Sequence, residues 1–421
     1  MSINLQKFKK VYFIGIGGIG VSAVARIFLQ KNIEVVGSDL VESVVTKDLI
    51  KKGAKIFVGK HDAKNLPDDV DLVVHTVAAT SDNPELVKAK KSGIKTMSYP
   101  EVLGELTKNK YLIAVSGTHG KTTTTAMIGL MLVDAGLDPT VIVGSNIKEF
   151  DGNARLGKSD YYVIEADEYR RAFLNYKPKI AVVLNIEFDH PDCYKDLDDV
   201  KDAFNLFIAR ADYIVDHPEN LMNDLNLKLK VPGKGFLLDA LAAREVGRIL
   251  EIDDKIIKES LENYQGSWRR FEIKGEINGV IVVDDYAHHP TEVKSTLQAA
   301  KEKYPDKNIV CVFQPHHQDR FNALFDEFVG AFNDCDRVIL TDVYHVAGRE
   351  ENRKQKTGNR KTSEDLAKKI GQKVIYVGGL DEAFEWLKKN VKPGDVVLTM
   401  GAGTITEVSD KLIKNLKLKN K

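Results

Sequence analysis

The segment GTHGKTTT, from Gly117 to Thr124, restricts the fold of this chain more than any other feature. It follows the apolar run 111–115, typical of a buried strand, and precedes the apolar run 126–132, typical of a helix. In such a strand–loop–helix unit, the backbone N–H groups at the start of the helix point at a bound anion. We therefore predict an α/β sheet with a phosphate-binding loop, in which Lys121 neutralises the outer phosphates and the Thr122 hydroxyl is a ligand of Mg²⁺.

The spacing of this loop differs from the general pattern G-x-x-x-x-G-K-[ST] at one position. The first glycine of the pattern falls on Val115. The alternative is therefore an ordinary glycine turn between a strand and a helix. The position of Gly-Lys-Thr where the strand meets the helix favours the phosphate loop.

A second glycine motif lies near the N-terminus. Gly15, Gly17 and Gly20 follow the strand-like run 11–14 and fit G-x-G-x-x-G, and Asp39 lies 19 residues after Gly20. This is the dinucleotide fingerprint with its ribose-binding acid. It predicts a site for a nucleotide diphosphate and does not distinguish NAD from a UDP-sugar.

Length and composition restrict the class of protein. A chain of 421 residues exceeds what a single core usually serves, so we expect two or three domains. Lys+Arg and Asp+Glu each total 61, which gives no electrostatic reason to expect nucleic acid or an acidic membrane surface. The N-terminal residues lack a signal-peptide core, and the three cysteines are widely spaced, as in a reduced cytoplasmic protein.

Polar side chains follow further strand-like runs. Glu165 follows the run 161–164, and the segment NIEFDH, which ends at His190, follows the run 180–184. Ligands of open α/β sheets gather at the carboxyl ends of strands, so we expect Lys121, Thr122, Glu165 and His190 to converge. A third α/β unit begins after residue 270, where polar residues again follow the strand-like runs.

With these residues in place, the chain resembles the Mur ligase family along nearly its whole length. The motifs that carry the resemblance are GIGGIGVS at 15–22, GTHGKT at 117–122, EADE at 165–168, NIEFDH at 185–190, DYAHHPTE at 285–292 and FQPH at 313–316. The resemblance implies an α/β fold of three Rossmann-like domains. These are a UDP-sugar-binding domain at 1–108, a central ATP-binding phosphate-loop domain at 109–269 and a C-terminal amino-acid-binding domain at 270–421.

The resemblance also implies a reaction. We expect a cytoplasmic, ATP-dependent and ADP-forming ligase of peptidoglycan precursor synthesis, with Mg²⁺ as cofactor. It would join L-alanine to the carboxylate of UDP-N-acetylmuramate through an acyl phosphate. His317 stands where arginine is frequent in the alanine-adding members, so glycine and serine stay open as the amino acid.

Site residues are carried over from the family position by position. The ATP-binding set is Gly117, Thr118, His119, Gly120, Lys121, Thr122, Thr123, Asp239 and Arg270. The UDP-sugar-binding set is Gly15, Gly17, Gly18, Gly20, Ser22, Asp39 and Asn153. The amino-acid-binding set is Tyr286, His288, His316 and Arg320. The metal ligands are Thr122, Glu165 and His190, and the catalytic residues are Lys121, Glu165, His190 and His288.

The chemistry of these side chains fits such roles. A histidine with a near-neutral pKa can hold or deprotonate the attacking ammonium, which suits His288. Arg320 can pair with an α-carboxylate through two parallel N–H···O bonds. His190 is an unusual ligand for Mg²⁺, which prefers oxygen, so its residue type alone favours hydrogen bonding or general-base catalysis.

Several residues keep two interpretations. Asp167 and Glu168 are as well suited to capping the next helix as to a site, and we leave them out of the catalytic set. Arg269 and Arg270 lie at the expected joint between the second and third domains. There they either contact ATP phosphates or solvate a hinge.

The expected adenine-binding stretch departs from the family. The family pattern is Gly-x-His-Asn-x-x-Asn, and the corresponding run here is GKGFLLD, from Gly233 to Asp239. An ionised carboxylate only accepts hydrogen bonds, so Asp239 cannot donate to a ring nitrogen of adenine. We expect weakened adenine recognition and some use of guanine. The short region 211–232 suggests that a piece of the second domain is missing.

Other functions stay open. A murein tripeptide ligase of the recycling pathway belongs to the same family and needs a pocket for a peptide. A nucleotide-binding homologue with altered catalysis is indicated by Asp239 and its neighbours. A dinucleotide oxidoreductase would account for the first glycine motif but gives the phosphate loop no role. The protein is expected to be a monomer or a homodimer that binds neither nucleic acid nor a membrane.

Overall fold

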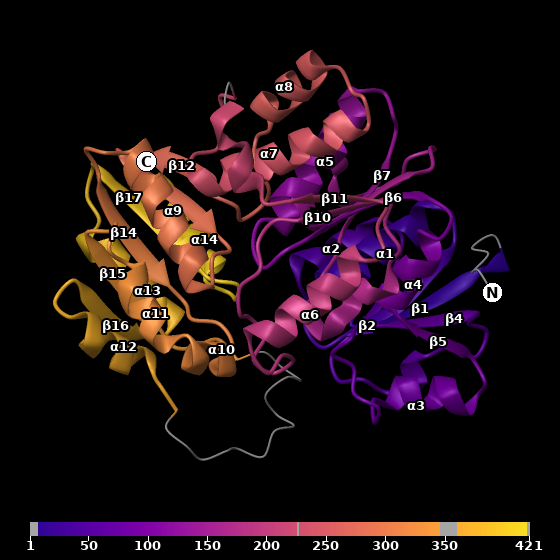
Figure 1. The fold of residues 1–421 in the computed structure, drawn as a ribbon. Helices are drawn as coiled ribbons and strands as arrows, with labels where there is room; N and C mark the ends of the chain where they lie inside the picture. Colours follow the sequence, from indigo (N-terminus) through magenta and orange to yellow (C-terminus); the bar gives the residue numbers. More distant parts are fainter. Residues whose placement is uncertain (1–6, 225–226, 346–359, 419–421) are drawn as a thin grey trace. The chain divides into compact units, whose positions relative to one another are not determined.

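The structure is a computed structural model that describes residues 7–224, 227–345 and 360–418. These residues form two compact units (Figure 1). The first unit takes in the described residues up to Glu187, together with 198–224 and 239–261. The second takes in 188–197, 227–238 and the described residues from 262 onward.

The first sheet of the first unit is entirely parallel, in the order β3-β2-β1-β4-β5. Its strands are β1 (Lys10–Ile14), β2 (Glu34–Asp39), β3 (Lys55–Val58), β4 (Leu72–His75) and β5 (Lys95–Ser98). Its helices are α1 (Ile19–Gln30), α2 (Val44–Lys51), α3 (Pro84–Lys91) and α4 (Tyr99–Leu106). The strand order reverses at β1, so the glycine motif that follows β1 lies at the crevice where such sheets bind ligands.

The second sheet of the first unit carries the phosphate loop. Its order is β11-β10-β6-β9-β7-β8, with only the β7–β8 pair antiparallel. Its strands are β6 (Tyr111–Ser116), β7 (Thr140–Ile147), β8 (Gly152–Arg155), β9 (Tyr161–Glu165), β10 (Ile180–Val183) and β11 (Tyr213–Asp216). Its helical elements are α5 (Lys121–Asp134), η4 (Tyr169–Asn175), α6 (Leu197–Ile208), α7 (Lys234–Ile249) and α8 (Asp254–Asn263). Because β6 lies between β9 and β10, the polar residues after these three strands meet at one edge.

The second unit contains a sheet in the order β12-β13-β17-β14-β15-β16. The β12–β13 pair is an antiparallel hairpin and the other pairs are parallel. Its strands are β12 (Glu272–Ile277), β13 (Val280–Asp285), β14 (Asn308–Phe313), β15 (Arg337–Thr341), β16 (Val374–Gly378) and β17 (Asp395–Met400). Its helices are α9 (Pro290–Lys303), α10 (Gln318–Ala323), α11 (Phe325–Ala331), α12 (Ser363–Ile370), α13 (Leu380–Asn390) and α14 (Thr406–Leu418).

Apolar runs form the buried strands, as the sequence predicts. All six residues of β13 and of β17 are buried, and four of the five in β1 are buried. Strands covered by helices on both faces need such continuous apolar runs. The predicted α/β class with three Rossmann-like sheets is confirmed. The boundaries at 108/109 and 269/270 each fall between two sheets and stay a prediction.

Among residues 7–224, 227–345 and 360–418, no helix combines the length and apolarity needed to cross a bilayer.

Candidate functional site

The loop between β6 and α5 has a backbone that requires glycine at two positions. Gly117 has φ +139° and Gly120 has φ +85°, both in the left-handed region that L side chains rarely adopt. A Cβ at Gly120 would lie 2.1 Å from Oδ1 of Asp239 and 2.9 Å from Cδ1 of Leu184. The loop thus packs closely against α7, and the N-terminal backbone of α5 takes the form of an anion cradle.

Lys121 is folded over the phosphate loop. Its Nζ donates to the carbonyl oxygens of Gly117, at 2.5 Å, and Thr118, at 3.2 Å, and to Oε2 of Glu168 at 2.9 Å. Burial works against the charged form of the ammonium, but Glu168, Asp167 and Glu165 raise the pKa of Lys121 above its ordinary value. The lysine therefore stays positively charged at neutral pH.

Thr122 and Glu165 lie together, as the strand-end pattern predicts. The Thr122 hydroxyl lies 3.0 Å from Oε2 and 3.2 Å from Oε1 of Glu165. The carboxylate also accepts the backbone N–H of Gly144 at 2.6 Å, and a Cβ at that glycine would lie 2.3 Å from Oε2. A hydroxyl and a carboxylate are hard oxygen donors, so these side chains fit Mg²⁺.

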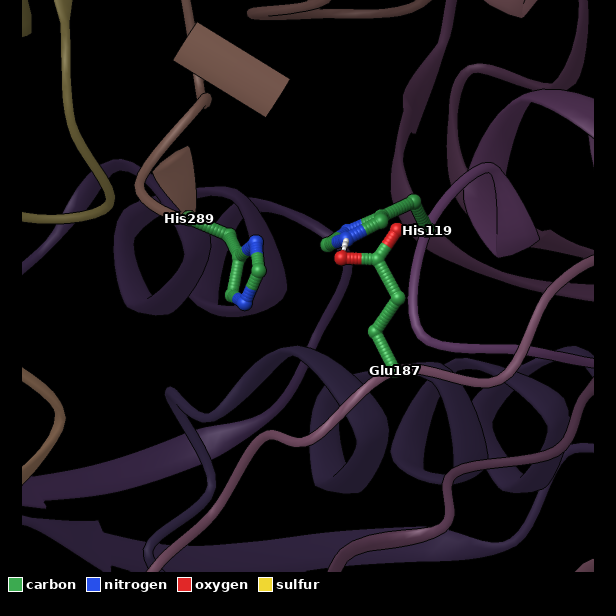
Figure 2. Close-up of side chains that lie close together, drawn as sticks. All are labelled: His119, Glu187 and His289. Atoms are coloured by element: carbon green, nitrogen blue, oxygen red, sulfur yellow. Dashed lines mark ion pairs between the residues drawn. The ribbon is translucent and has the colours of Figure 1, made fainter. Parts of the chain in front are cut away.

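The residues after β10 hold the phosphate loop in shape. The side-chain amide of Asn185 accepts the His119 N–H at 2.8 Å and donates to the His119 carbonyl at 3.1 Å. The Thr118 hydroxyl accepts the Glu187 N–H at 2.8 Å. The His119 imidazole faces the Glu187 carboxylate, with Nε2 3.6 Å from Oε2 (Figure 2). Asn185 was not among the predicted site residues, although its motif was.

The sequence left the roles of Asp167 and Glu168 undecided between a helix cap and a site. Asp167 accepts the N–H of Tyr169 at 3.0 Å, the local bond expected of a residue that begins a helical turn. Glu168, only 3% exposed, instead pairs with Lys121. Asp167 thus accepts a hydrogen bond from the backbone of its own segment, whereas Glu168 forms an ion pair with the lysine of the phosphate loop.

The remaining ATP-binding candidates divide between the two units. Thr123 is buried in the first turn of α5 and Asp239 is buried on α7, both in the first unit. Arg270 belongs to the second unit, where its guanidinium lies over the Tyr286 ring, 5.1 Å from the centroid, and 4.0 Å from Glu292. Arg269 donates from Nε to Asp284 at 2.9 Å and is 3% exposed, so it braces this unit rather than solvating a hinge.

The glycine loop after β1 is bound by Asp39 at the end of β2. Oδ2 of Asp39 accepts the Gly17 N–H at 2.8 Å, and Oδ1 accepts the Val41 N–H at 3.2 Å. Gly18 is the N-cap of α1, and Gly15 has φ +73°. The predicted residues Gly15, Gly17, Gly18 and Asp39 therefore form one local structure. Gly20 lies in the first turn of α1, where a Cβ would meet the Tyr99 ring at 2.7 Å.

Asn153 connects the two sheets of the first unit. From β8, its amide donates to the Ile19 carbonyl at 2.6 Å and to the Ser22 hydroxyl at 3.0 Å. Its Oδ1 accepts from Nε of Arg26 at 2.8 Å. The predicted residues Ser22 and Asn153 thus lie side by side, fully buried. Arg26 also forms an ion pair with Asp48 at 2.6 Å. This buried arginine was not predicted from the sequence, because a single arginine in a helix is usually exposed to solvent.

The predicted amino-acid residues of the second unit also lie together. The rings of Tyr286 and His288 have centroids 5.4 Å apart, and those of His288 and His316 are 5.9 Å apart. Nη1 of Arg320 lies 3.5 Å from Nδ1 of His316. The His316 ring stacks on Tyr344 with centroids 5.4 Å apart.

The expected near-neutral pKa of His288 is not found. Burial, opposed by Glu292 and assisted by Arg320, lowers the pKa of His288 to about 4. The imidazole is therefore neutral at pH 7 and a weak base. It can accept a hydrogen bond from an ammonium but removes a proton from one only with difficulty.

The guanidinium of Arg320 has a carboxylate partner within its own unit. Nε donates to Oδ1 of Asp189 at 2.7 Å and Nη2 to Oδ2 at 3.0 Å, a two-bond pair. Although burial alone would raise it, Arg320 and His190 hold the pKa of Asp189 well below its usual range. Nε2 of His190 lies 3.7 Å from Oδ2 of Asp189. Binding of the substrate α-carboxylate by Arg320 stays a prediction. It requires the guanidinium to bind Asp189 and the substrate carboxylate at the same time.

Comparison with family models gives three consecutive matches. Residues 10–111 match the "Mur ligase family, catalytic domain", 115–231 the "Mur ligase middle domain" and 269–403 the "Mur ligase, glutamate ligase domain". Together they cover most of the chain.

Individual proteins agree with these matches. The chain is 41% identical to the UDP-N-acetylmuramate–L-alanine ligase of Clostridium botulinum strain Loch Maree over 458 aligned positions, covering 97% of this chain and 98% of that protein. It is 41% identical to the same-named protein of Clostridium tetani, covering 98% of this chain and all of that one. The crystal structure of the UDP-N-acetylmuramate-alanine ligase of Thermotoga maritima superimposes with a TM-score of 0.84 at 30% identity, covering 97% of this chain and 99% of that one. A murein peptide ligase of Psychrobacter arcticus shares the fold, with a TM-score of 0.71 at 22% identity.

Proposed function

This chain belongs to the Mur ligase family, and we propose that it joins L-alanine to the carboxylate of UDP-N-acetylmuramate with ATP, forming ADP and phosphate. The observation that carries the proposal is 41% identity over 97% of the chain to ligases of that name. The phosphate loop with Lys121 over it supports the ATP-dependent step. The reaction belongs to peptidoglycan precursor synthesis.

The chemistry proceeds in two steps. A carboxylate oxygen of UDP-N-acetylmuramate attacks the γ-phosphorus of ATP, and ADP leaves as the acyl phosphate forms. The amine of alanine then attacks the acyl carbon, loses a proton and displaces inorganic phosphate. Both steps bring anions together, so fixed positive charge contributes most of the rate enhancement. Lys121, kept charged by its carboxylate neighbours, supplies part of it.

We propose that ATP phosphates lie on the backbone of the loop 117–120 and the first turn of α5, with Lys121, Thr122 and Thr123. Thr122 and Glu165 would hold Mg²⁺, and His190 would hold a second ion. When bound, the ion supplies positive charge that offsets the charge of the phosphates. The hydroxyl–carboxylate contact of 3.0 Å supports the first of these assignments.

We propose that the uridine diphosphate group binds the glycine loop after β1. The first turn of α1 presents backbone N–H groups there, and Asp39 fixes the loop through Gly17. Asn153 would act indirectly, because its amide groups are bonded to Ser22, the Ile19 carbonyl and Arg26. It holds α1 in position rather than presenting a group to the ligand.

We propose that the amino acid binds at the ring cluster of Tyr286, His288 and His316. The neutral imidazole of His288 would accept a hydrogen bond from the substrate ammonium, and Nη1 of Arg320 would meet the α-carboxylate. The contacts among these side chains bring the proposed binding groups together, which supports a small amino acid such as alanine, glycine or serine. We further propose a cytoplasmic monomer or homodimer that acts without nucleic acid.

A second candidate is a ligase or nucleotide-binding homologue with altered nucleotide choice. Asp239, buried and packed against Gly120, is the observation that favours it. A carboxylate accepts from guanine donors and offers no donor to adenine. Competition of GTP against ATP for the protein tests this candidate, and strict preference for ATP would dismiss it.

Phosphate release from ATP tests the main proposal. UDP-N-acetylmuramate is supplied with L-alanine, glycine, L-serine or the tripeptide L-Ala-D-Glu-diaminopimelate, and Lys121→Ala is the control. Release that depends on L-alanine is expected. Release only with the tripeptide would indicate a recycling ligase, and no release despite nucleotide binding would indicate the altered homologue.

A further inference from the structure

All three donors of the Lys121 ammonium have acceptors within the protein. Two bonds go to carbonyl oxygens of the loop itself, those of Gly117 and Thr118, and the third goes to Oε2 of Glu168 at 2.9 Å. A lysine ammonium has three N–H groups and no more. A phosphate oxygen that binds this ammonium must therefore take the place of one of these acceptors.

Glu168 is the acceptor most like a phosphate oxygen. It is anionic, 3% exposed, and reaches Lys121 from the segment that follows β9. The carbonyls of Gly117 and Thr118 belong to the same loop as the lysine and move with it. The carboxylate is separate from the loop, so its bond can break while the loop keeps its shape.

We propose that Glu168 is a positioning residue that holds the third donor of Lys121 in the place of a phosphate oxygen. Nucleotide binding exchanges the carboxylate for phosphate, and the reverse exchange assists departure of the product nucleotide. This inference rests on the proposed nucleotide binding at the loop. It predicts that Glu168 lowers nucleotide affinity, whereas a residue with a purely structural role would raise it.

Asp167 offers a matched control. Its charge contributes to the raised pKa of Lys121, but its carboxylate accepts the Tyr169 N–H at 3.0 Å, a bond that asparagine also accepts. Asp167→Asn and Glu168→Gln each remove one negative charge from neighbouring positions. Only Glu168→Gln weakens the bond that occupies the third donor.

Titration calorimetry with ADP measures the effect on the full chain, first in EDTA and then with Mg²⁺. A bond to a charged acceptor is stronger than one to a neutral amide, so Glu168→Gln is expected to bind ADP roughly five- to tenfold more tightly than the native protein in EDTA. Asp167→Asn is expected to gain less than about twofold, because screened charge alone changes. The KM for ATP is expected to fall in the same order.

Three outcomes would overturn the inference. Weaker ADP binding by Glu168→Gln than by the native protein would give Glu168 a structural role. Equal gains for the two variants would reduce the effect to charge alone. If the native, folded protein binds no nucleotide even with Mg²⁺, the proposed function fails and this inference with it. If Glu168→Gln does not fold, Glu168→Asp, whose side chain is shorter by one methylene, takes its place. This variant should also bind ADP more tightly than the native protein, and an unchanged ADP affinity would refute the exchange.

Discussion

Replacement of Gly120 by alanine adds a methyl group where the phosphate loop meets α7. The new Cβ would lie 2.1 Å from Oδ1 of Asp239 and 2.9 Å from Cδ1 of Leu184, at a residue with φ +85°. The carboxylate must therefore move, and the backbone must keep a conformation that alanine disfavours.

The magnitude follows from these two effects. A left-handed conformation costs a non-glycine residue about 1–2 kcal/mol. Forcing a packed side chain aside costs about 1–3 kcal/mol more. Gly120→Ala should therefore lower the free energy of opening of α5 by about 2–5 kcal/mol, a factor of roughly 30 or more in the opening equilibrium.

Native-state hydrogen exchange of the α5 amides, Lys121–Asp134, measures this free energy in the full chain. Gly136 is the matched control, since it follows the same helix, has φ +73° and would place its Cβ in open space. Gly136→Ala should cost only the conformational part, about 1–2 kcal/mol.

A double-mutant cycle isolates the contact. In an Asp239→Ala background, Gly120→Ala should cost up to about 3 kcal/mol less than in the native background, because the carboxylate is removed while Cδ1 of Leu184 still lies close to the new Cβ. Equal costs in the two backgrounds would refute the close packing of α7 on the loop. Equal costs for the two glycine variants would refute it as well.

Three further predictions concern other contacts. Glu85 raises the pKa of His61, so the stability that this pair gives the first unit is full below the unfolded pKa and is lost as pH rises through the folded pKa. The urea midpoint should therefore fall as the pH rises above the ordinary histidine pKa of about 6.5, and His61→Gln should flatten this dependence. Asn185→Ala removes both bonds to the His119 backbone and should weaken nucleotide binding about tenfold in calorimetry, whereas unchanged affinity would mean that the loop keeps its shape alone. Arg269→Ala removes the ion-pair partner of the buried Asp284 carboxylate and should destabilise the second unit by about 3–5 kcal/mol in tryptophan-monitored denaturation. A loss of stability below about 1 kcal/mol would contradict the buried ion pair.

Buried central strands could be predicted from the sequence, whereas the edge strands β8 and β12 could not. β13 and β17 contain the apolar runs 280–283 and 396–398 because helices and neighbouring strands cover them. β8, with the sequence GNAR, and β12, with EIKGEI, lie at sheet edges and belong to antiparallel pairs. β8 holds one apolar residue, Ala154, and its buried Asn153 is polar, whereas charged residues interrupt β12. Neither strand therefore carries the apolar signature on which the prediction depends.

Strand ends predicted part of the site for a topological reason. Thr122 and Glu165 were expected to meet because both follow parallel strands, and β6 and β9 are adjacent. The pattern could not assign Asp167 and Glu168, since neighbouring residues of one segment point in different directions. Which carboxylate reaches the loop depends on the backbone after β9, and residue type carries no information about that.

Ionisation states were the least predictable property. The sequence identifies His288 and Arg320 as basic residues but does not tell which groups surround them. Asp189, 131 positions before Arg320, neutralises the guanidinium, and burial keeps the His288 imidazole neutral. Such effects depend on distances between segments remote in sequence, which pattern and spacing do not contain.

The charges around the phosphate loop set the conditions under which it can work. Lys121 is surrounded by the carboxylates of Glu165, Asp167 and Glu168, and Asp239 packs against the loop itself. Two unit charges 4 Å apart interact by about 4 kcal/mol at an effective dielectric constant of 20. One lysine cannot offset both these carboxylates and the phosphates of a nucleotide. Nucleotide binding at this loop should therefore depend strongly on a divalent cation. If the affinity for ADP were the same in EDTA as in Mg²⁺, another positively charged group would have to bind the phosphates.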